Sequence, residues 1–443
     1  MVQLRATDKP ETEDESPRNP PPLWRNRDYA GWWVSSLVSS LGSAMSQLAY
    51  PLLMLYATNS VARAGIVGAC LNIGGLSTGL LGGALADRYS RRVLVVTADL
   101  VQAVAVGTVV FAVANGFVNV GHIAAVALIQ GMCNGISGAA MTPTLKRIVH
   151  ESQFPALAAS KQGRDMIARL AGPPLGGALF SAARYLPFLG DTISFVVSAI
   201  GVAAIRRPLG PDAADREAHS SSLAALREGI AYIRTNTYLR FVVVWVPLLS
   251  AAFGGMVLLT IALIKLRGGG PTTVGVVTTI AAIGGLGGAL AAPFLARLFK
   301  ARTLVIIMAW LVVLVAVGLA AAPRPWEIGL VGALAVFLVV PLNVMLESYQ
   351  LRVVPDAMLG RVAAALSFSS SALLWTAPLT TGVLADNFGT PTAMLVVAGF
   401  LAVLAVWCTL AKAPHEMDVQ TPIQLVTGPR PDAQPPGSST PRS

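Results

Sequence analysis

Long apolar stretches, separated by short polar loops, occupy almost the whole chain. A helix needs about 20 apolar residues to cross the hydrocarbon core of a bilayer, and stretches of this length recur along the sequence. The longest polar segment inside the chain, Arg206 to Arg240, divides these stretches into two groups of six. The pattern predicts an all-α membrane protein with twelve transmembrane helices, at residues 30–57, 64–86, 93–114, 121–142, 163–183, 186–205, 238–264, 273–296, 303–322, 328–351, 361–385 and 391–412.

Polar segments flank and join the two groups of predicted helices. The tails, residues 1–27 and 413–443, are rich in charged or Pro, Ser and Thr residues, and we expect both to be disordered. The predicted halves are residues 28–205 and 238–412, joined by a linker at 206–237. Apolar linker residues follow serines that suit a helix N-cap, at a spacing that predicts a short amphipathic helix on the membrane surface. They are Leu223, Leu226, Ile230 and Ile233.

Composition supports a membrane protein. Hydrophobic residues make up 54% of the chain and charged residues only 12%, whereas soluble domains carry about a quarter charged residues. The net charge of +10 is explained by topology. With the N-terminus inside, most Lys and Arg residues fall on the inner side, which favours two cytoplasmic termini in a plasma (bacterial inner) membrane. The basic residues outside are Arg63, Arg184, Lys265, Arg267 and Arg324, and Arg169 lies within a span.

The sequence contains no pattern typical of a cofactor, metal or nucleic-acid site. Cys70, Cys133 and Cys408 each fall inside a predicted span without metal-ligand spacing. No basic cluster is interleaved with exposed aromatic residues, as nucleic-acid binding would require. We therefore expect no cofactor, no metal and no nucleic acid. We also expect a monomer that lies in the lipid bilayer.

One sequence offset links distant parts of the chain. Residues 82–86 read GGALA, and so do residues 287–291, which follow 205 positions later. The same offset pairs Pro173 with Pro378 and Gly177 with Gly382. A single long offset indicates a duplicated half rather than a short tandem array. Transporters are commonly built from two such repeats, so we predict two pseudo-symmetric six-helix halves.

The loop after the second predicted span carries the most specific motif. Residues 83–92 contain Gly83-x-Leu85-Ala86-Asp87-Arg88-x-x-Arg91-Arg92, which resembles the loop signature of the major facilitator superfamily in the place where that superfamily has it. Ser90 stands where the family usually has glycine. The resemblance implies the twelve-helix major facilitator fold and a conformational latch. The latch would place Asp87 against the helix N-terminus near Arg361 to Ala365, where the helix dipole attracts a carboxylate. Its expected members are Gly83, Asp87, Arg88, Arg91 and Arg92.

A second motif lies in the fifth predicted span. Residues 172–177, with Gly172, Pro173, Gly176 and Gly177, resemble the GPxxGG core that marks drug/proton antiporters. The alternative is an ordinary Gly/Pro kink in a packed helix. The resemblance implies that this packing seals the cavity against proton leak.

Three further segments resemble the exporter branch that contains enterobactin exporters and macrolide-efflux proteins. The resemblance covers residues 24 to 412. Ser43 departs from this branch, which often has an acid there, and Ala127 stands where many proton antiporters have an arginine. The three segments are Asn26 to Tyr29, Ala49 to Leu53, and Val354 to Asp356 with Gly360 to Val362.

Ionisable residues within spans are candidates for function, because each costs about 2.5–3.5 kcal/mol to insert. Asp99, Glu347 and Asp165 are the candidate proton carriers. Asp165 is the weaker candidate, because Arg169, four residues later, could pair with it on one helix face. For Asp99 a structural partnership with an arginine stays open. We expect Asp191 and Asp386, near outer span ends, to be interfacial.

Neutral polar residues form stripes on single helix faces. Ser36, Ser40, Ser43 and Gln47 follow a 4-3-4 spacing, and similar stripes run through Gln130 and Asn343. For any one residue, interhelical hydrogen bonding is the alternative to lining a cavity. In the superfamily that the motif resembles, spans one, four, seven and ten surround the cavity, which favours lining. The candidate cavity residues are Ser39, Ser43, Gln47, Tyr50, Gln130, Asn134, Asn343 and Trp375, together with Glu347.

These features predict a secondary active transporter rather than an enzyme. We expect export of a small amphipathic organic compound (a drug, an antibiotic or a secondary metabolite such as a siderophore) by proton antiport with alternating access. The alternatives are a proton-coupled uptake symporter and a non-transporting membrane receptor. Residues 135–138 resemble a serine-protease motif of rhomboid type, but the four histidines lie at span ends, in loops or in the tail, so no general base is expected nearby. The chain also has no phosphate-binding loop for ATP.

Overall fold

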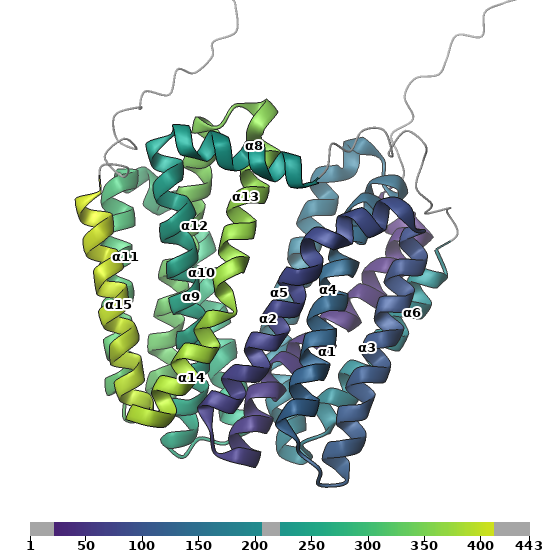
Figure 1. The fold of residues 1–443 in the computed structure, drawn as a ribbon, viewed down its shortest axis with the longest axis horizontal. Coiled ribbons are helices and arrows are strands. Elements are labelled where there is room, and N and C mark those ends of the chain that lie inside the picture. The colour runs from purple at the N-terminus through teal and green to yellow at the C-terminus, as the bar shows by residue number, and fades with distance from the viewer. Residues whose placement is uncertain (1–21, 206–221, 412–443) are drawn as a thin grey trace, which may run out of the picture.

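A computed structural model describes residues 22–205 and 222–411, and all regular structure in these ranges is helical (Figure 1). The predicted tails lie largely outside the described residues, as does the first part of the linker. The short helix η1 (Leu23–Arg25) belongs to the part of the N-terminal tail that is described, and it buries Leu23. The protein therefore has an all-α fold, as its sequence predicts.

Six helices form the N-terminal half, and the linker helix and seven further helices follow. The N-terminal half contains α1 (Arg27–Thr58), α2 (Val61–Arg88), α3 (Arg91–Ala114), α4 (Val120–Ile148), α5 (Phe154–Ala182) and α6 (Leu186–Ala203), with η2 (Glu151–Gln153) before α5. The linker contains α8 (Ser222–Thr235). The C-terminal half contains α9 (Thr237–Leu266), α10 (Pro271–Leu298), α11 (Ala301–Ala321), α12 (Pro325–Val353), α13 (Asp356–Leu374), α14 (Thr376–Phe388) and α15 (Thr390–Leu410).

Polar residues in the short loops start several of these helices. The side chain of Asn26 accepts hydrogen bonds from the backbone N–H groups of Asp28 and Tyr29 at the start of α1. Ser60, Asn119 and Asn236 cap α2, α4 and α9 in the same manner. An N-cap side chain satisfies backbone donors that have no partner inside the helix, so these loops set the helix boundaries that the apolar pattern predicts.

Ten helical segments in the described chain are long and apolar enough to cross a membrane. One of them runs through α13 and α14 as a single segment, Met358–Phe388. The long helices that do not reach this threshold are α1, with 32 residues, and α5, with 29 residues. Their length suffices for a bilayer, so their polar composition sets them apart. Both helices line the central cavity, as shown below, and their crossing of the membrane stays a prediction.

The outer surface of the bundle is apolar, as contact with lipid requires. Large side chains such as Leu290, Phe294 and Leu410 have 75%, 63% and 76% of their surface exposed. In the interior, Trp245 is fully buried and donates its indole N–H to the carbonyl oxygen of Leu404 at 3.0 Å. A bilayer favours a protein whose outer surface is apolar and whose interior polar groups form hydrogen bonds within the protein.

The two halves lie side by side and diverge toward one end of the bundle (Figure 1). We call this end, where α8 lies, the linker end, and the opposite end, where α1 ends and α2 begins, the far end. The closest backbone approaches between the halves occur toward the far end, in α2 against α14 and α5 against α10. The molecule therefore closes between its halves at the far end.

The far-end contacts are pseudo-symmetric. A Cβ atom on Gly177 would lie 2.5 Å from the carbonyl oxygen of Pro271, the first residue of α10, and one on Gly382 would lie 2.8 Å from that of Val61, the first residue of α2. Such approaches are open only to glycine. Gly177 and Gly382 are separated by the 205-residue offset of the sequence repeat. The repeat therefore corresponds to equivalent packing positions in the two halves.

Candidate substrate cavity

Three contiguous hollows form a central cavity between the halves. The N-half part has a volume of about 720 Å³, the middle part about 480 Å³ and the C-half part about 550 Å³. Gln47 and Asn134 line both the N-half part and the middle part. Ser367 and Ser371 line both the middle part and the C-half part. The shared residues join the hollows into one space, whose size suits a small organic molecule.

The cavity reaches the linker ends of its helices. In the N-half part, Lys161 and Val202 lie near the linker ends of α5 and α6. In the C-half part, Gln350 and Leu351 lie in the last turn of α12. The cavity therefore extends toward the linker end, while the far end is closed.

The N-half part is strongly polar. Its walls come from α1, α3, α4, α5 and α6. Four predicted cavity residues, Ser39, Ser43, Gln47 and Asn134, line it. The acids Asp99 and Asp165 and the bases Lys161, Arg164 and Arg169 line it as well. This concentration of polar groups on α1 and α5 explains why these two helices are too polar to be recognised as spans by composition.

Asp99 and Gln102 lie on one face of α3, at the cavity wall. They retain only 4% and 1% of their surface exposed. The side chain of Ser198 on α6 is close enough to Asp99 to interact with its carboxylate. Oδ2 of Asp99 and Oε1 of Gln102 are nevertheless buried without a hydrogen-bond donor. The described chain thus leaves two acceptors open at this wall.

Asp165 pairs with its neighbour Arg164 rather than with Arg169. The Nη2 atom of Arg164 lies 2.7 Å from Oδ1 of Asp165, and its Nε atom lies 3.0 Å from the same oxygen. Arg164 also donates to the hydroxyl of Ser36 and lies over the ring of Trp32, 5.5 Å from its centroid. The predicted pairing of Asp165 with Arg169 on one helix face is therefore wrong, because a side chain one residue away reaches the carboxylate first.

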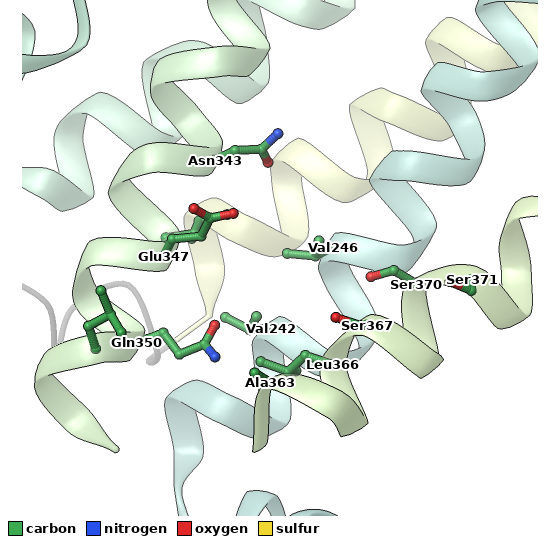
Figure 2. A pocket seen from close by; sticks show the side chains of 12 residues that line it. Val242, Val246, Asn343, Glu347, Gln350, Ala363, Leu366, Ser367, Ser370 and Ser371 are labelled. Atoms are coloured by element: carbon green, nitrogen blue, oxygen red, sulfur yellow. The ribbon is translucent and has the colours of Figure 1, made fainter. Parts of the chain in front are cut away.

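The C-half part carries one acid. Figure 2 shows Asn343, Glu347 and Gln350 of α12 facing the serines of α13 across the hollow. Glu347 is exposed to the cavity and makes no recorded ion pair or hydrogen bond with the described part of the chain. The polar spacing of α12 places Asn343, Glu347 and Gln350 on one helix face, and in the structure this face lines the C-half part of the cavity.

Tyr50 and Gln130 lie behind the cavity wall. They are only 3% and 2% exposed. The Tyr50 hydroxyl donates to Oε1 of Gln130 at 2.8 Å, and Nε2 of Gln130 donates to Oδ2 of Asp191 at 3.0 Å. Ser43, which does line the cavity, donates to Oδ1 of Asp191 at 3.4 Å. The structure thus places these two predicted cavity residues in a buried hydrogen-bonded chain that touches the cavity at Ser43.

Asp191 is the polar residue that sequence reasoning misplaced. It has no exposed surface, whereas its position near the start of α6 suggested the interface. Besides Gln130 and Ser43, it accepts a hydrogen bond from Ser194 at 3.3 Å. Asp191, Ser194 and Ser198 recur at 3-4 spacing on α6, and this stripe was the available signal for an inward-facing acid.

Trp375 marks the break between α13 and α14 and is half-buried. It does not line any of the three hollows described above. Within the described residues, no group of three or more His, Cys, Asp and Glu residues is placed to hold a metal ion.

Two charged side chains fasten the far end. Asp386 at the end of α14 accepts hydrogen bonds from the hydroxyl of Ser60 at 2.5 Å and from the backbone N–H groups of Val61 and Ala62 at 2.7 and 3.1 Å. Its negative charge thereby meets the N-terminus of α2, where the helix dipole is positive. Asp386 is an exposed residue at the end of the bundle, in the region where the sequence placed it.

The second of these side chains, Lys265 of α9, meets the C-terminus of α1. Its Nζ atom donates to the carbonyl oxygen of Leu55 at 2.5 Å and to Oδ1 of Asn59 at 2.8 Å. In one contact the C-terminal half supplies the acceptor, Asp386, and in the other it supplies the donor, Lys265. We call these two contacts the far-end clasp. Both would have to break for the far end to open.

The GPxxGG segment lies in the packing between helices at this end. Cβ atoms on Gly172 and Gly176 would lie 2.4 Å from the Cβ of Ala44 and 3.0 Å from the Cα of Met45, both on α1. Gly177 and the carbonyl oxygen of Pro173 instead contact the first residues of α10. The segment therefore packs α5 against its own half and against the other half at the same level.

The latch motif lies at the linker end, and its central members are only partly described. The surroundings of Gly83 and the side chain of Asp87 are not described, while Arg88 is exposed and Arg91 is buried. Arg92 donates to the carbonyl oxygen of Ile205 at the end of α6. In the predicted docking region on α13, Nη1 of Arg361 lies 2.5 Å from Oε2 of Glu228 on α8. The latch itself stays a prediction.

Comparison with known families places the protein. A family model described as transmembrane secretion effector, of the major facilitator type, matches residues 21–420. The chain belongs to this family. It is accordingly a multi-pass integral membrane transporter of the major facilitator type, with a small-molecule substrate. None of the curated proteins matches the chain significantly in sequence.

Solved structures share the fold of this transporter at low sequence identity. A bacterial homologue of the human lysosomal transporter Spinster, in an inward-facing and unoccupied conformation, has a TM-score of 0.72 at 11% identity, covering 90% of this chain and 99% of that one. The nucleoside transporter NupG has a TM-score of 0.68 at 16% identity, with 87% and 98% covered. A bacterial homologue of the iron transporter ferroportin, inward-facing, has 0.64 at 16%, with 88% and 99% covered. At these identities the likeness establishes the fold alone.

Proposed function

We propose that this transporter exports a small amphipathic organic compound by proton antiport. The observation that carries the proposal is the central cavity, which is closed at the far end, reaches the linker end and has acids in both halves. The family description as secretion effectors supports the outward direction. The GPxxGG segment supports it too, because Gly177 and Pro173 contact α10 of the other half, as a seal against proton leak requires.

Asp99 and Glu347 are the proposed proton carriers. Each lines the cavity from a different half, Asp99 from α3 and Glu347 from α12. An acid in a cavity that is exposed alternately to the two sides of the membrane takes up a proton outside and releases it inside. Asp165 is the third candidate, and it differs from the other two because it forms an ion pair with Arg164.

The proposed setting is the plasma (bacterial inner) membrane, with both termini in the cytoplasm and the protein acting as a monomer. The distribution of basic residues over the loops supports this orientation. The linker end then faces the cytoplasm, so the cavity in this structure is positioned to load substrate from inside the cell.

Transport in everted membrane vesicles tests the proposal. We expect compounds from a panel of amphipathic drugs and metabolites to accumulate inside these vesicles, and an uncoupler to abolish the accumulation. Asp99→Asn and Glu347→Gln should each reduce it at least about tenfold if they carry the proton. Glu327→Gln is the matched control, because Glu327 lies in the first turn of α12 outside the three hollows. Accumulation in right-side-out cells instead would indicate uptake, and accumulation that survives the uncoupler would contradict proton coupling.

A further inference from the structure

Opposite charges line the N-half part of the cavity, and several of their polar atoms have no partner in the described part of the chain. Lys161 and Arg169 of α5 line it and make no ion pair or hydrogen bond within the described part of the chain. On the α3 wall, Oδ2 of Asp99 and Oε1 of Gln102 have no donor. The intervening Arg164 differs, because Asp165, Ser36 and Trp32 satisfy it.

Arg169 and Asp99 lie at comparable depth, whereas Lys161 lies about 12 Å nearer the linker end of α5. Arg169 precedes the far end of α5 by about 20 Å and Asp99 precedes the far end of α3 by about 22 Å, at 1.5 Å per helical residue. Both helices border the same hollow of about 720 Å³. The acidic wall and the basic wall therefore border one hollow, which is large enough for one small molecule.

The unpaired groups specify complementary ligand chemistry. A buried acceptor without a donor costs about 1–3 kcal/mol, and more when it is charged. A ligand ammonium group offers N–H donors together with a positive charge, which suits Asp99 and Gln102. The planar guanidinium of Arg169 suits a carboxylate or phosphate, which accepts two parallel hydrogen bonds. A purely cationic or neutral compound would leave the basic wall unmatched.

We propose that the substrate is a small zwitterion, whose ammonium group binds Asp99 and Gln102 and whose anionic group binds Arg169. This inference rests on the proposed function, since it concerns the same cavity. The substrate ammonium and the transported proton then compete for Asp99. Binding of one displaces the other, which couples the two fluxes without a separate proton site.

A size-matched ligand series tests the proposal by binding alone. The probes are phenylalanine, its methyl ester (cation only), N-acetylphenylalanine (anion only) and N-acetylphenylalanine methyl ester (neutral). Binding to the purified full chain in detergent is measured by equilibrium dialysis. We expect phenylalanine to bind about tenfold more tightly than either singly capped probe, and the neutral probe to bind weakest. Glycerophosphoethanolamine, added as a competitor, shows whether a lipid headgroup meets the same site.

Two variants assign the walls. Asp99→Asn should remove the preference for the free amine and keep that for the carboxylate, while Arg169→Gln should do the reverse. The conservative variants Asp99→Glu and Arg169→Lys should restore part of each preference, which separates recognition from folding. Equal binding of all four probes, or loss of both preferences in each variant, would overturn the assignment. Because no transport is measured, a failure here is distinct from a failure of proton-driven export.

Discussion

Asp191 is enclosed completely, and its hydrogen bonds come from three helices of the N-terminal half. Gln130 on α4, Ser43 on α1 and Ser194 on α6 all direct donors at its carboxylate. Such a network fixes the relative positions of the helices that form one wall of the cavity. Since each donor lies in a low-dielectric interior, removing the acceptor leaves the donors unsatisfied.

Replacing Asp191 should therefore destabilise the N-terminal half. We expect Asp191→Ala to lower the free energy of unfolding by about 1–3 kcal/mol, because Gln130 loses its acceptor. Asp191→Asn keeps an acceptor of the same shape and should cost clearly less. Thermal unfolding of the purified variants measures the difference, and an alanine variant as stable as the asparagine variant would contradict the structural role.

At the residue scale, periodicity identifies faces but not depth. It directs Ser43, Asn134 and Glu347 to inward faces, and these residues line cavity hollows, because neighbouring positions on a helix face share a direction. The same periodicity predicts that Gln130 lines the cavity, although helix packing buries Gln130 behind the cavity wall. Depth depends on how neighbouring helices approach, and no single-helix pattern contains that information.

The helix α5 combines two roles along its length. Its linker-side half presents Lys161, Arg164, Asp165 and Arg169 to the cavity, and its far-end half packs through glycines against α1 and α10. The same helix therefore forms part of the polar cavity wall and part of the contact that closes the far end. A movement of α5 changes both.

Alanine substitutions on α5 separate the seal from general helix effects. Gly177→Ala places a methyl group about 2.5 Å from the backbone of Pro271, and overpacking of this kind costs about 1–3 kcal/mol. Gly163→Ala on the same helix meets nothing within 4 Å and provides the matched control. We expect only Gly177→Ala to lower both thermal stability and transport, and equal behaviour of the two variants would contradict a seal at this position.

The predicted latch belongs to the conformation in which the linker end is closed. Asp87→Asn keeps the shape of the side chain and removes the charge that would meet the N-terminus of α13. We expect this variant to insert normally and to transport several-fold more slowly, as measured by membrane yield and vesicle export. Arg63→Gln, a charge change at the far end of the same helix, is the control. Transport by Asp87→Asn at the wild-type rate would rule out the latch.

Most helix boundaries follow the apolar pattern to within a few residues, but α4 ends at Ile148 rather than at 142 and α5 begins at Phe154 rather than at 163. The break between α13 and α14 shows the limit of this reasoning. Pro378 has no N–H for the carbonyl oxygen of Leu374, four residues earlier, and α13 ends at Leu374. The sequence indicates that a kink occurs near Pro378. Only the packing of the neighbouring helices decides whether the segment bends or divides there.

At the scale of the whole molecule, two related halves meet at one end and diverge toward the other (Figure 1). The 205-residue offset predicts the equivalence of the halves, and their glycine contacts at Pro271 and Val61 are equivalent. The offset carries no information on which end is closed. Open and closed states of such molecules differ by only a few kcal/mol, a balance that depends on many contacts together.

Weakening the far-end clasp should shift this balance. Asp386→Ala removes a carboxylate that accepts three hydrogen bonds at the start of α2, and Lys265→Ala removes donors to Leu55 and Asn59. We expect each variant to increase the population with an open far end, and the double variant to increase it further. Distances between spin labels on the far ends of α2 and α14 measure the shift. Unchanged distance distributions would show that the clasp does not hold the end closed.

Cross-linking of the far end tests the central claim of alternating access most directly. The Oγ atom of Ser181 on α5 lies 2.8 Å from Oγ1 of Thr272 on α10, so Ser181→Cys with Thr272→Cys places two thiols within reach of a disulfide or a short bifunctional reagent. The pair is introduced after replacement of the native cysteines, and transport is measured before oxidation, after it and after reduction. Our account predicts that oxidation abolishes transport and that reduction restores it. Continued transport by fully cross-linked protein would contradict it.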